Sequence, residues 1–252
     1  MDWYFIVAVI VSILIILSIL IFFLVIFYGL KIYSFFLPNS VVCNFDLTLN
    51  EKIGNPHHKK FVSLTIDDSP SIYTEHILQI LNEHKAKATF FLIGSFIENR
   101  EETVKKILLN GHEIANHMFK DRSSLKLKFE EFVDKMNLTQ SIIDRLKDND
   151  EKMEKKWIRP GGGFFNKSML QYFGKNKTLT PVLGDIYPFD AQIKSKFIIK
   201  NTILKRAHNG GVIILHERKW TTSYLDEILT CLNKNNFECT TLSKMYKISK
   251  NV

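Results

Sequence analysis

One apolar run near the N-terminus constrains this chain more than any other feature of its sequence. From Trp3 to Leu30 no residue is charged, and all 28 positions are apolar except Ser12, Ser18 and Gly29. As a helix the run would be about 42 Å long, more than the roughly 30 Å hydrocarbon core of a bilayer requires. A core helix of a soluble domain rarely runs this far without a polar face. The run therefore predicts one membrane-spanning helix.

A cleavable signal peptide is the main alternative explanation of this run. Such a peptide has a basic start, an apolar stretch of about 7–15 residues and a small-residue cleavage site. Here Asp2 is the only charged residue before the run, and no such site follows it. We therefore expect an uncleaved single-pass membrane anchor over residues 1–37. The positive-inside rule has only Lys31 to count near the membrane, which weakly favours a cytosolic domain.

The rest of the chain reads as a linker followed by one α/β domain. Residues 38–60 lack hydrophobic periodicity and contain Pro38, Gly54 and Pro56, which is typical of a linker. Beyond them, apolar runs alternate with amphipathic stretches. We expect strands at 61–66, 88–93, 113–116, 156–159, 180–184, 211–215 and 237–241, with helices near 72–84, 96–109, 125–147, 194–207 and 222–235. This alternation predicts, over residues 61–252, a mainly parallel sheet or barrel with helices outside it.

The pattern of charges argues against nucleic-acid binding, and the cysteines argue against a disulfide framework or a zinc module. The net charge is +8, and without Asp2 and Lys31 the chain keeps 33 basic against 25 acidic side chains. The lysines are scattered singly and in pairs, without an interleaved aromatic motif, so we expect a solvated basic surface and no nucleic-acid partner. Cys43, Cys231 and Cys239 match neither a disulfide framework nor a zinc module.

Side chains capable of chemistry follow five of the predicted strands. The segments are TIDDSP at 65–70, HEIANHMFKD at 112–121, IRPGGG at 158–163, GDIYPFD at 184–190 and ILHE at 214–217. In α/β folds such strand ends meet at one edge of the sheet or barrel. His117 and Asp121 are four residues apart, one turn of helix, so both could face one metal ion. Together the five segments predict a hydrolytic metal site.

In this order and at this spacing, the five segments resemble the motifs of the polysaccharide deacetylases, the NodB-homology family also called carbohydrate esterase family 4. The resemblance covers about residues 61–246. It implies a deformed (β/α) barrel. It also implies an enzyme that removes acetyl groups from N-acetylated glycans, such as chitin or peptidoglycan, using a divalent metal ion.

The resemblance assigns a base and three metal ligands. Asp67 would be the general base, and Asp68 and His117 would hold the metal. Asp121 takes the position of the family's second metal-binding histidine, and Met118 replaces a Ser or Thr. A carboxylate oxygen suits zinc and also harder ions, so we expect zinc, with Co, Mn or Fe as alternatives.

The remaining segments supply the other parts of an amide hydrolase. By resemblance, Arg159 would orient the base, and a backbone amide around Gly162 would stabilise the oxyanion of the tetrahedral intermediate. His216 would protonate the leaving amine. A carboxylate would raise the pKa of His216, and we assign this role to Asp185, with Asp190 as the alternative.

Two functions from different classes are compatible with these residues. The first is a membrane-anchored deacetylase whose partners are an N-acetylated glycan and the membrane. The second is a catalytically silent descendant that binds a glycan or a protein, which four departures from the family motifs favour: Ser69, Met118, Asp121 and Gly162. Retention of both Asp67 and His216 favours the enzyme, because a silent binder needs neither base nor acid. Other metal hydrolases, including a phosphoesterase, form a third class. The resemblance to the family also implies that the domain lies on the extracytoplasmic or lumenal side of the membrane.

Overall fold

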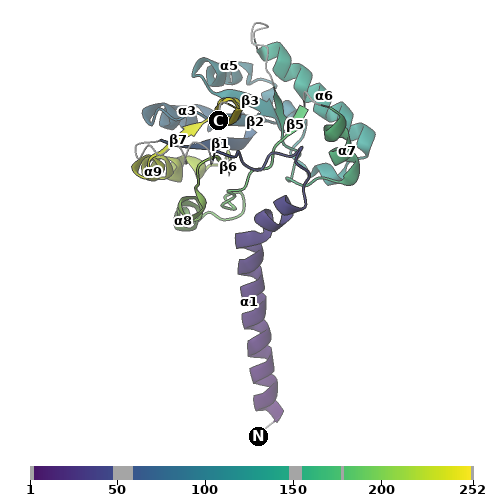
Figure 1. The fold of residues 1–252 in the computed structure, drawn as a ribbon, viewed down its shortest axis with the longest axis vertical. Helices are drawn as coiled ribbons and strands as arrows, with labels where there is room; N and C mark the ends of the chain where they lie inside the picture. The colour runs from purple at the N-terminus through teal and green to yellow at the C-terminus, as the bar shows by residue number, and fades with distance from the viewer. Residues whose placement is uncertain (1–2, 48–58, 148–154, 177–178, 251–252) are drawn as a thin grey trace. The chain divides into compact units, whose positions relative to one another are not determined.

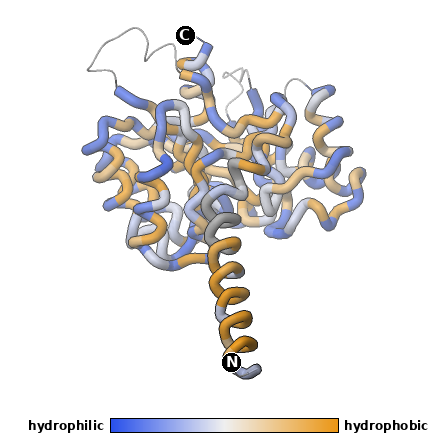
Figure 2. Tube along the Cα trace, turned by 60° about the horizontal axis from the view of Figure 1, so that its bottom comes forward, coloured by the Kyte–Doolittle hydropathy of each residue, from blue (hydrophilic) through white to orange (hydrophobic). Residues whose placement is uncertain are grey.

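The computed structural model describes residues 3–47, 59–147, 155–176 and 179–250. The chain forms two compact units, Met1–Leu37 and Pro38–Val252. The first unit contains helix α1 (Trp3–Phe35). Its segment Trp3–Ile21 has a mean hydropathy of 3.2 and is not buried within the protein, so it is long and apolar enough to cross a membrane. Figure 2 shows that most of the described part of this helix is hydrophobic.

The second unit is built on a parallel sheet of seven strands. The strands are β1 (Lys60–Ser69), β2 (Thr89–Leu92), β3 (Glu113–Asn116), β4 (Lys156–Ile158), β5 (Leu179–Pro181), β6 (Gly211–His216) and β7 (Phe237–Thr240). Their order is β5-β4-β3-β2-β1-β6, and β7 also pairs with β1. Isolated parallel bridges join Val42 to Val182 and Ile186 to Ile213, beyond the two ends of this order. These bridges extend the sheet toward a deformed barrel, as the family resemblance implied.

Helices lie around this sheet (Figure 1). They are α3 (Thr74–Glu83), α4 (Gly94–Ile97), α5 (Glu101–Leu109), α6 (Phe129–Leu146), α7 (Lys167–Lys175), α8 (Lys196–Arg206), α9 (Thr221–Lys234) and α10 (Leu242–Lys250), with a 3₁₀ turn at Ser124–Lys126. The expected alternation of strands and helices is confirmed. The sequence analysis did not predict α7 and α10, and it joined α4 and α5 into one helix.

Strand β1 separates the apolar core from the polar interior. Its even-numbered side chains Val62, Leu64 and Ile66 are fully buried in the main core cluster with residues of α3 and α9. The side chains that alternate with them, Ser63, Thr65 and Asp67, are polar yet also buried. Successive side chains of a strand point to opposite faces. The alternation therefore directs Asp67 into the interior of the barrel.

The segment expected to be a linker is partly packed against the domain. Phe45 and Leu47 are buried, with 7% and 2% of their surface exposed. The Phe45 N–H donates to the Gly210 carbonyl oxygen (2.9 Å), and the Val42 N–H donates to that of Pro181 (2.9 Å). Residues 38–47 have turn, bend and irregular backbone, which has no helix or strand periodicity, and Phe45 and Leu47 belong to a core cluster with Trp157. The linker prediction for 38–60 is therefore wrong for 38–47, and residues 48–58 lie outside the described part of the chain.

Candidate active site

Asp67 and Arg159 meet at the carboxyl ends of β1 and β4. The Arg159 Nη1 donates to Asp67 Oδ1 at 2.5 Å and to Thr65 Oγ1 at 2.9 Å. Its Nε donates to the Val182 carbonyl oxygen at 3.2 Å, and its guanidinium lies 4.2 Å from the centre of the Phe91 ring. Since β2 and β3 separate β1 from β4, this contact requires the sheet to curve strongly. Asp67 is therefore a buried carboxylate held by a buried arginine, the contact that the family resemblance implied for this pair.

His117 follows β3 and faces both carboxylates near the end of β1. Its Nδ1 lies 2.8 Å from the Arg159 carbonyl oxygen. Because a carbonyl oxygen only accepts, Nδ1 carries a proton and Nε2 points the other way. The Nε2 lies 3.4 Å from Asp68 Oδ1 and 3.8 Å from Asp67 Oδ2. Burial lowers the pKa of His117, but the charges of the two carboxylates outweigh burial and raise this pKa above its ordinary value.

Asp121 does not join Asp68 and His117. It is exposed, and among the residues that the structure describes, no three His, Cys, Asp or Glu side chains are grouped so that they could hold a metal ion. The prediction assumed a helical turn between His117 and Asp121. Instead, Met118 has a left-handed backbone (φ 68°), and an irregular loop follows it. The four-residue spacing therefore does not place both side chains on one helix face.

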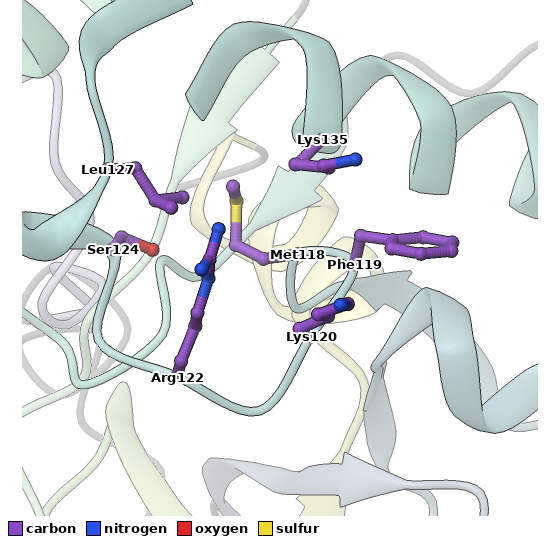
Figure 3. A pocket seen from close by; sticks show the side chains of 7 residues that line it. All are labelled: Met118, Phe119, Lys120, Arg122, Ser124, Leu127 and Lys135. Carbon is purple, nitrogen blue, oxygen red and sulfur yellow. The ribbon is translucent and has the colours of Figure 1, made fainter. Parts of the chain in front are cut away.

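Met118 lines a small pocket between this loop and α6. Figure 3 shows the side chains around it, which belong to Met118, Phe119, Lys120, Arg122, Ser124, Leu127 and Lys135. The lining does not include Asp67, Asp68 or His117. Met118, which replaces the Ser or Thr of the family motif, thus packs beside the site and adds no polar group to it.

Arg218 follows β6 and forms an ion pair with Asp68 that the sequence analysis missed. Its Nη2 lies 2.5 Å from Asp68 Oδ2. Burial raises the pKa of Asp68, but the hydrogen bond from His117 and the charges of His117, His216 and Arg218 outweigh burial, so this pKa lies well below its usual range. The residues present thus do not fit the predicted three-ligand metal site. Of the three predicted ligands, Asp68 and His117 lie together, and the Arg218 guanidinium contacts Asp68.

His216 is held by Asp190 at the end of β6. The His216 Nδ1 lies 3.0 Å from Asp190 Oδ1, and the His216 backbone N–H donates to Asp190 Oδ2 at 2.7 Å. Asp190 is fully buried, and its Oδ2 also accepts a hydrogen bond from the Tyr224 hydroxyl at 3.1 Å. Burial lowers the pKa of His216, but the hydrogen bond and the charge of Asp190 outweigh burial and raise it above its ordinary value.

Asp185, which we assigned as the partner of His216, lies elsewhere. Its Oδ2 is 2.6 Å from His208 Nε2, and its Oδ1 accepts from the Val212 N–H at 2.9 Å. The pairing register of this segment with β6 explains why Asp185 does not reach His216. Because Ile186 pairs with Ile213, residue 185 lies near the start of β6, whereas Asp190 reaches its end. The assignment of Asp185 is wrong, and the alternative, Asp190, makes the contact.

The glycine loop after β4 presents Gly162 to solvent. Gly162 is exposed and has a left-handed backbone (φ 80°), which favours glycine. The neighbouring amides are bonded within the loop region, Gly161 N–H to Ser124 Oγ at 2.9 Å and Gly163 N–H to the Pro160 carbonyl oxygen at 3.0 Å. The Gly162 amide therefore remains the candidate for binding a ligand oxygen.

Ser69, which differs from the family motif, forms a hydrogen bond that stabilises the end of β1. The Ser69 Oγ donates to the buried Glu217 Oε2 at 2.6 Å. The other oxygen of Glu217 accepts from the Ser71 N–H at 2.8 Å and from Thr74 Oγ1 at 2.6 Å. Glu217 thus ties the end of β6 to the turn between β1 and α3, and Ser69 completes this network.

Comparisons with known proteins show which proteins this chain is similar to. The family model described as polysaccharide deacetylase matches residues 54–178. A peptidoglycan-N-acetylglucosamine deacetylase of Bacillus cereus is 30% identical over 203 residues, which cover 78% of this chain and 72% of the relative. The uncharacterized protein YlxY of Bacillus subtilis is 28% identical over 199 residues, and the match spans 59% of its length. The solved structure of the peptidoglycan deacetylase PdaC from Bacillus subtilis has a TM-score of 0.68 and 26% identity, over 78% of this chain and 95% of that one.

Proposed function

Because the chain belongs to the polysaccharide deacetylase family, we propose that it hydrolyses the N-acetyl group of an N-acetylated glycan. One observation carries this proposal. Asp67 and His216 are register partners on the adjacent strands β1 and β6, and each is held by an oppositely charged group, Arg159 and Asp190. A buried carboxylate and an imidazole side by side can act as base and acid on one substrate.

The two groups divide the reaction between them. Asp67 accepts a proton from water as the water oxygen bonds to the acetamide carbonyl carbon. His216 then donates a proton to the sugar nitrogen as the C–N bond breaks, which yields acetate and a free amine. General base and general acid catalysis each contribute typically about 10²–10⁴-fold to such rates. We assign the stabilisation of the oxyanion to the exposed Gly162 amide.

The metal dependence implied by the family resemblance has no complete ligand set in the described residues. Asp68 and His117 would be two of the ligands, while Asp121 is exposed and outside any such group. A bound ion would supply Lewis-acid activation of the water or the carbonyl. Since the residues do not fit, no step of the proposal passes through a metal.

The substrate class and the location complete the proposal. Relatives named as peptidoglycan-N-acetylglucosamine deacetylases support a chitin- or peptidoglycan-like glycan as the substrate. We propose that α1 anchors the chain in a membrane and that the domain lies on the extracytoplasmic or lumenal side. The length and hydropathy of Trp3–Ile21 support the anchor.

A second candidate function is a silent domain that binds a glycan without cleaving it. The ion pair between Arg218 and Asp68 favours this candidate, since it lies where the family resemblance places a metal ligand. The paired Asp67 and His216 favour the enzyme, because glycan binding requires neither group.

Acetate release separates the candidates. The full chain in detergent is given N-acetylglucosamine oligomers, once with a chelator and once with Zn, Co or Mn, and a phosphate monoester in parallel. We expect acetate from the oligomers and no phosphate from the monoester. Turnover of the monoester alone would favour another hydrolase class, and binding of oligomers without acetate release would favour the silent domain.

A further inference from the structure

Arg218 brings a positive charge to the buried carboxylate of Asp68. Its guanidinium Nη2 lies 2.5 Å from Asp68 Oδ2, and its Nη1 donates to the Glu217 carbonyl oxygen at 3.1 Å. The Arg218 backbone N–H donates to Thr221 Oγ1 at 3.1 Å. The Asp68 side chain is only 6% exposed, and that of Arg218 is 28% exposed. The arginine is thus fixed at its backbone and at both terminal nitrogens.

The second oxygen of Asp68 is directed at an imidazole. Asp68 Oδ1 lies 3.4 Å from His117 Nε2, on the ring edge opposite the bond between Nδ1 and the Arg159 carbonyl oxygen. Asp68 therefore lies between a guanidinium and an imidazole. A metal ion shared by Asp68 and His117 would have to bind next to the guanidinium.

The charges of the site are already balanced by side chains. Asp67 pairs with Arg159, Asp68 with Arg218, and Asp190 with His216. A buried charge is stable when it is paired and hydrogen-bonded. A divalent ion would add two positive charges to a site in which each buried carboxylate already has a cationic or hydrogen-bonding partner.

The residue at the position of the second metal-binding histidine does not complete a metal site. Asp121 is exposed. The described residues include no third donor grouped with Asp68 and His117.

We propose that the Arg218 guanidinium takes the place of the divalent metal ion in this site, with Asp68 as its ion-pair partner. The inference concerns the site of the proposed function and rests on that assignment. It predicts a chain that carries no metal at Asp68 and whose site becomes a metal site once the guanidinium is removed.

Co²⁺ is the probe for this inference, because its binding is read from its visible absorption and from equilibrium dialysis, without an activity assay. The chains compared, full-length in detergent, are wild type, Arg218→Met, Arg218→Lys, Lys219→Met and Arg218→Met/Asp121→His. Lys219 is exposed and adjacent, so Lys219→Met makes the same change of charge away from Asp68. We expect no Co²⁺ at the site in wild type, Arg218→Lys and Lys219→Met. We expect Arg218→Met and the double variant to bind Co²⁺ at least about tenfold more tightly than wild type does. Adding Asp68→Asn to either variant should abolish this Co²⁺ binding.

Two binding results would overturn the inference. One is a wild-type chain that binds one equivalent of Co²⁺ whose absorption disappears in Asp68→Asn, a result that decides even if Arg218→Met fails to fold. The other is a folded double variant that binds Co²⁺ no better than wild type. Acetate release that needs added metal would also overturn the inference, and it would leave the proposed function standing. Exclusion of Co²⁺ without acetate release would support the inference and contradict the proposed function.

Discussion

At the scale of single residues, the protonation of His216 depends on one buried carboxylate. Asp190 accepts from both the ring and the backbone of His216, and the Tyr224 hydroxyl and the Trp220 indole hold Asp190 in turn. A fixed negative charge stabilises the imidazolium more than the neutral ring. The acid of the proposed reaction is therefore prepared by a residue that need not touch the substrate.

Asp190→Asn should move the alkaline limb of the pH–rate profile to lower pH. The Asp190 charge raises the pKa of His216, so kcat/KM falls only when the pH rises through that raised value. Without the charge this pKa falls, and the limb should shift to lower pH. Asp185→Asn, a matched change five residues earlier, should leave the limb in place. Equal shifts in both variants would refute the assignment of Asp190.

Residue identities at strand ends could be predicted from the sequence, but their contacts could not. The apolar runs located Asp67, His117, Arg159 and His216 correctly, because strand ends follow directly from hydropathy. The grouping of Asp121 with His117 failed, since a left-handed residue at Met118 ended the regular backbone that the spacing assumed. Arg218 was missed although it lies two residues after His216, because nothing in a single sequence showed which carboxylate it would reach.

At the scale of elements, the segment before β1 stabilises the domain that follows it. Phe45 packs edge-on against the Trp157 ring of β4, with 6.3 Å between ring centres. Its N–H bonds to Gly210, whose backbone (φ 88°) approaches so closely that a Cβ there would lie 2.0 Å from the Phe45 carbonyl oxygen. The domain therefore begins before residue 61, with the segment around Phe45 packed between the ends of two strands.

Phe45→Ala should lower the free energy of unfolding by about 3–5 kcal/mol, the usual cost of removing a buried phenyl ring. Phe197→Ala removes the same ring from α8, where it is 72% exposed, and should change that free energy by less than about 0.5 kcal/mol. Urea unfolding of the two variants, followed by circular dichroism, measures the difference. Similar midpoints for both would show that 38–47 does not belong to the folded domain.

The predictability of the elements follows their length and amphipathicity. Strands β1, β2, β3 and β6 and helices α3, α6 and α9 could be predicted because each has a clear apolar run or face. The nine-residue helices α7 and α10 were missed, since helices this short give few repeats of the pattern. The segment 38–47 was misjudged because its packing is irregular.

At the scale of the whole molecule, the chain joins an apolar helix to a hydrolase-like domain. The helix is apolar along Trp3–Ile21 and not buried within the protein, which in water would expose a large apolar surface. Membrane insertion would remove that surface from water. An anchored enzyme of this kind would act on glycan held near a bilayer.

The anchor predicts that the chain extracted from membranes retains its N-terminal segment. Intact mass spectrometry of the alkali-resistant membrane fraction should find the full chain, because no small-residue cleavage site follows the run. A glycosylation reporter at the C-terminus should be modified if the domain lies on the lumenal or extracytoplasmic side. A soluble chain that begins after the apolar run would identify a cleaved signal peptide and contradict the anchor.

The proposed hydrolysis is tested by the acetate that four full-length chains release from N-acetylglucosamine oligomers: wild type, Asp67→Asn, His216→Ala and Asp185→Asn. The account predicts that kcat/KM falls by about 10²–10⁴-fold in each of the two variants that remove the base or the acid. It predicts a near wild-type value for Asp185→Asn, whose carboxylate contacts His208. Acetate release that survives Asp67→Asn and His216→Ala, or a folded wild-type chain that releases none, would contradict the proposed hydrolysis.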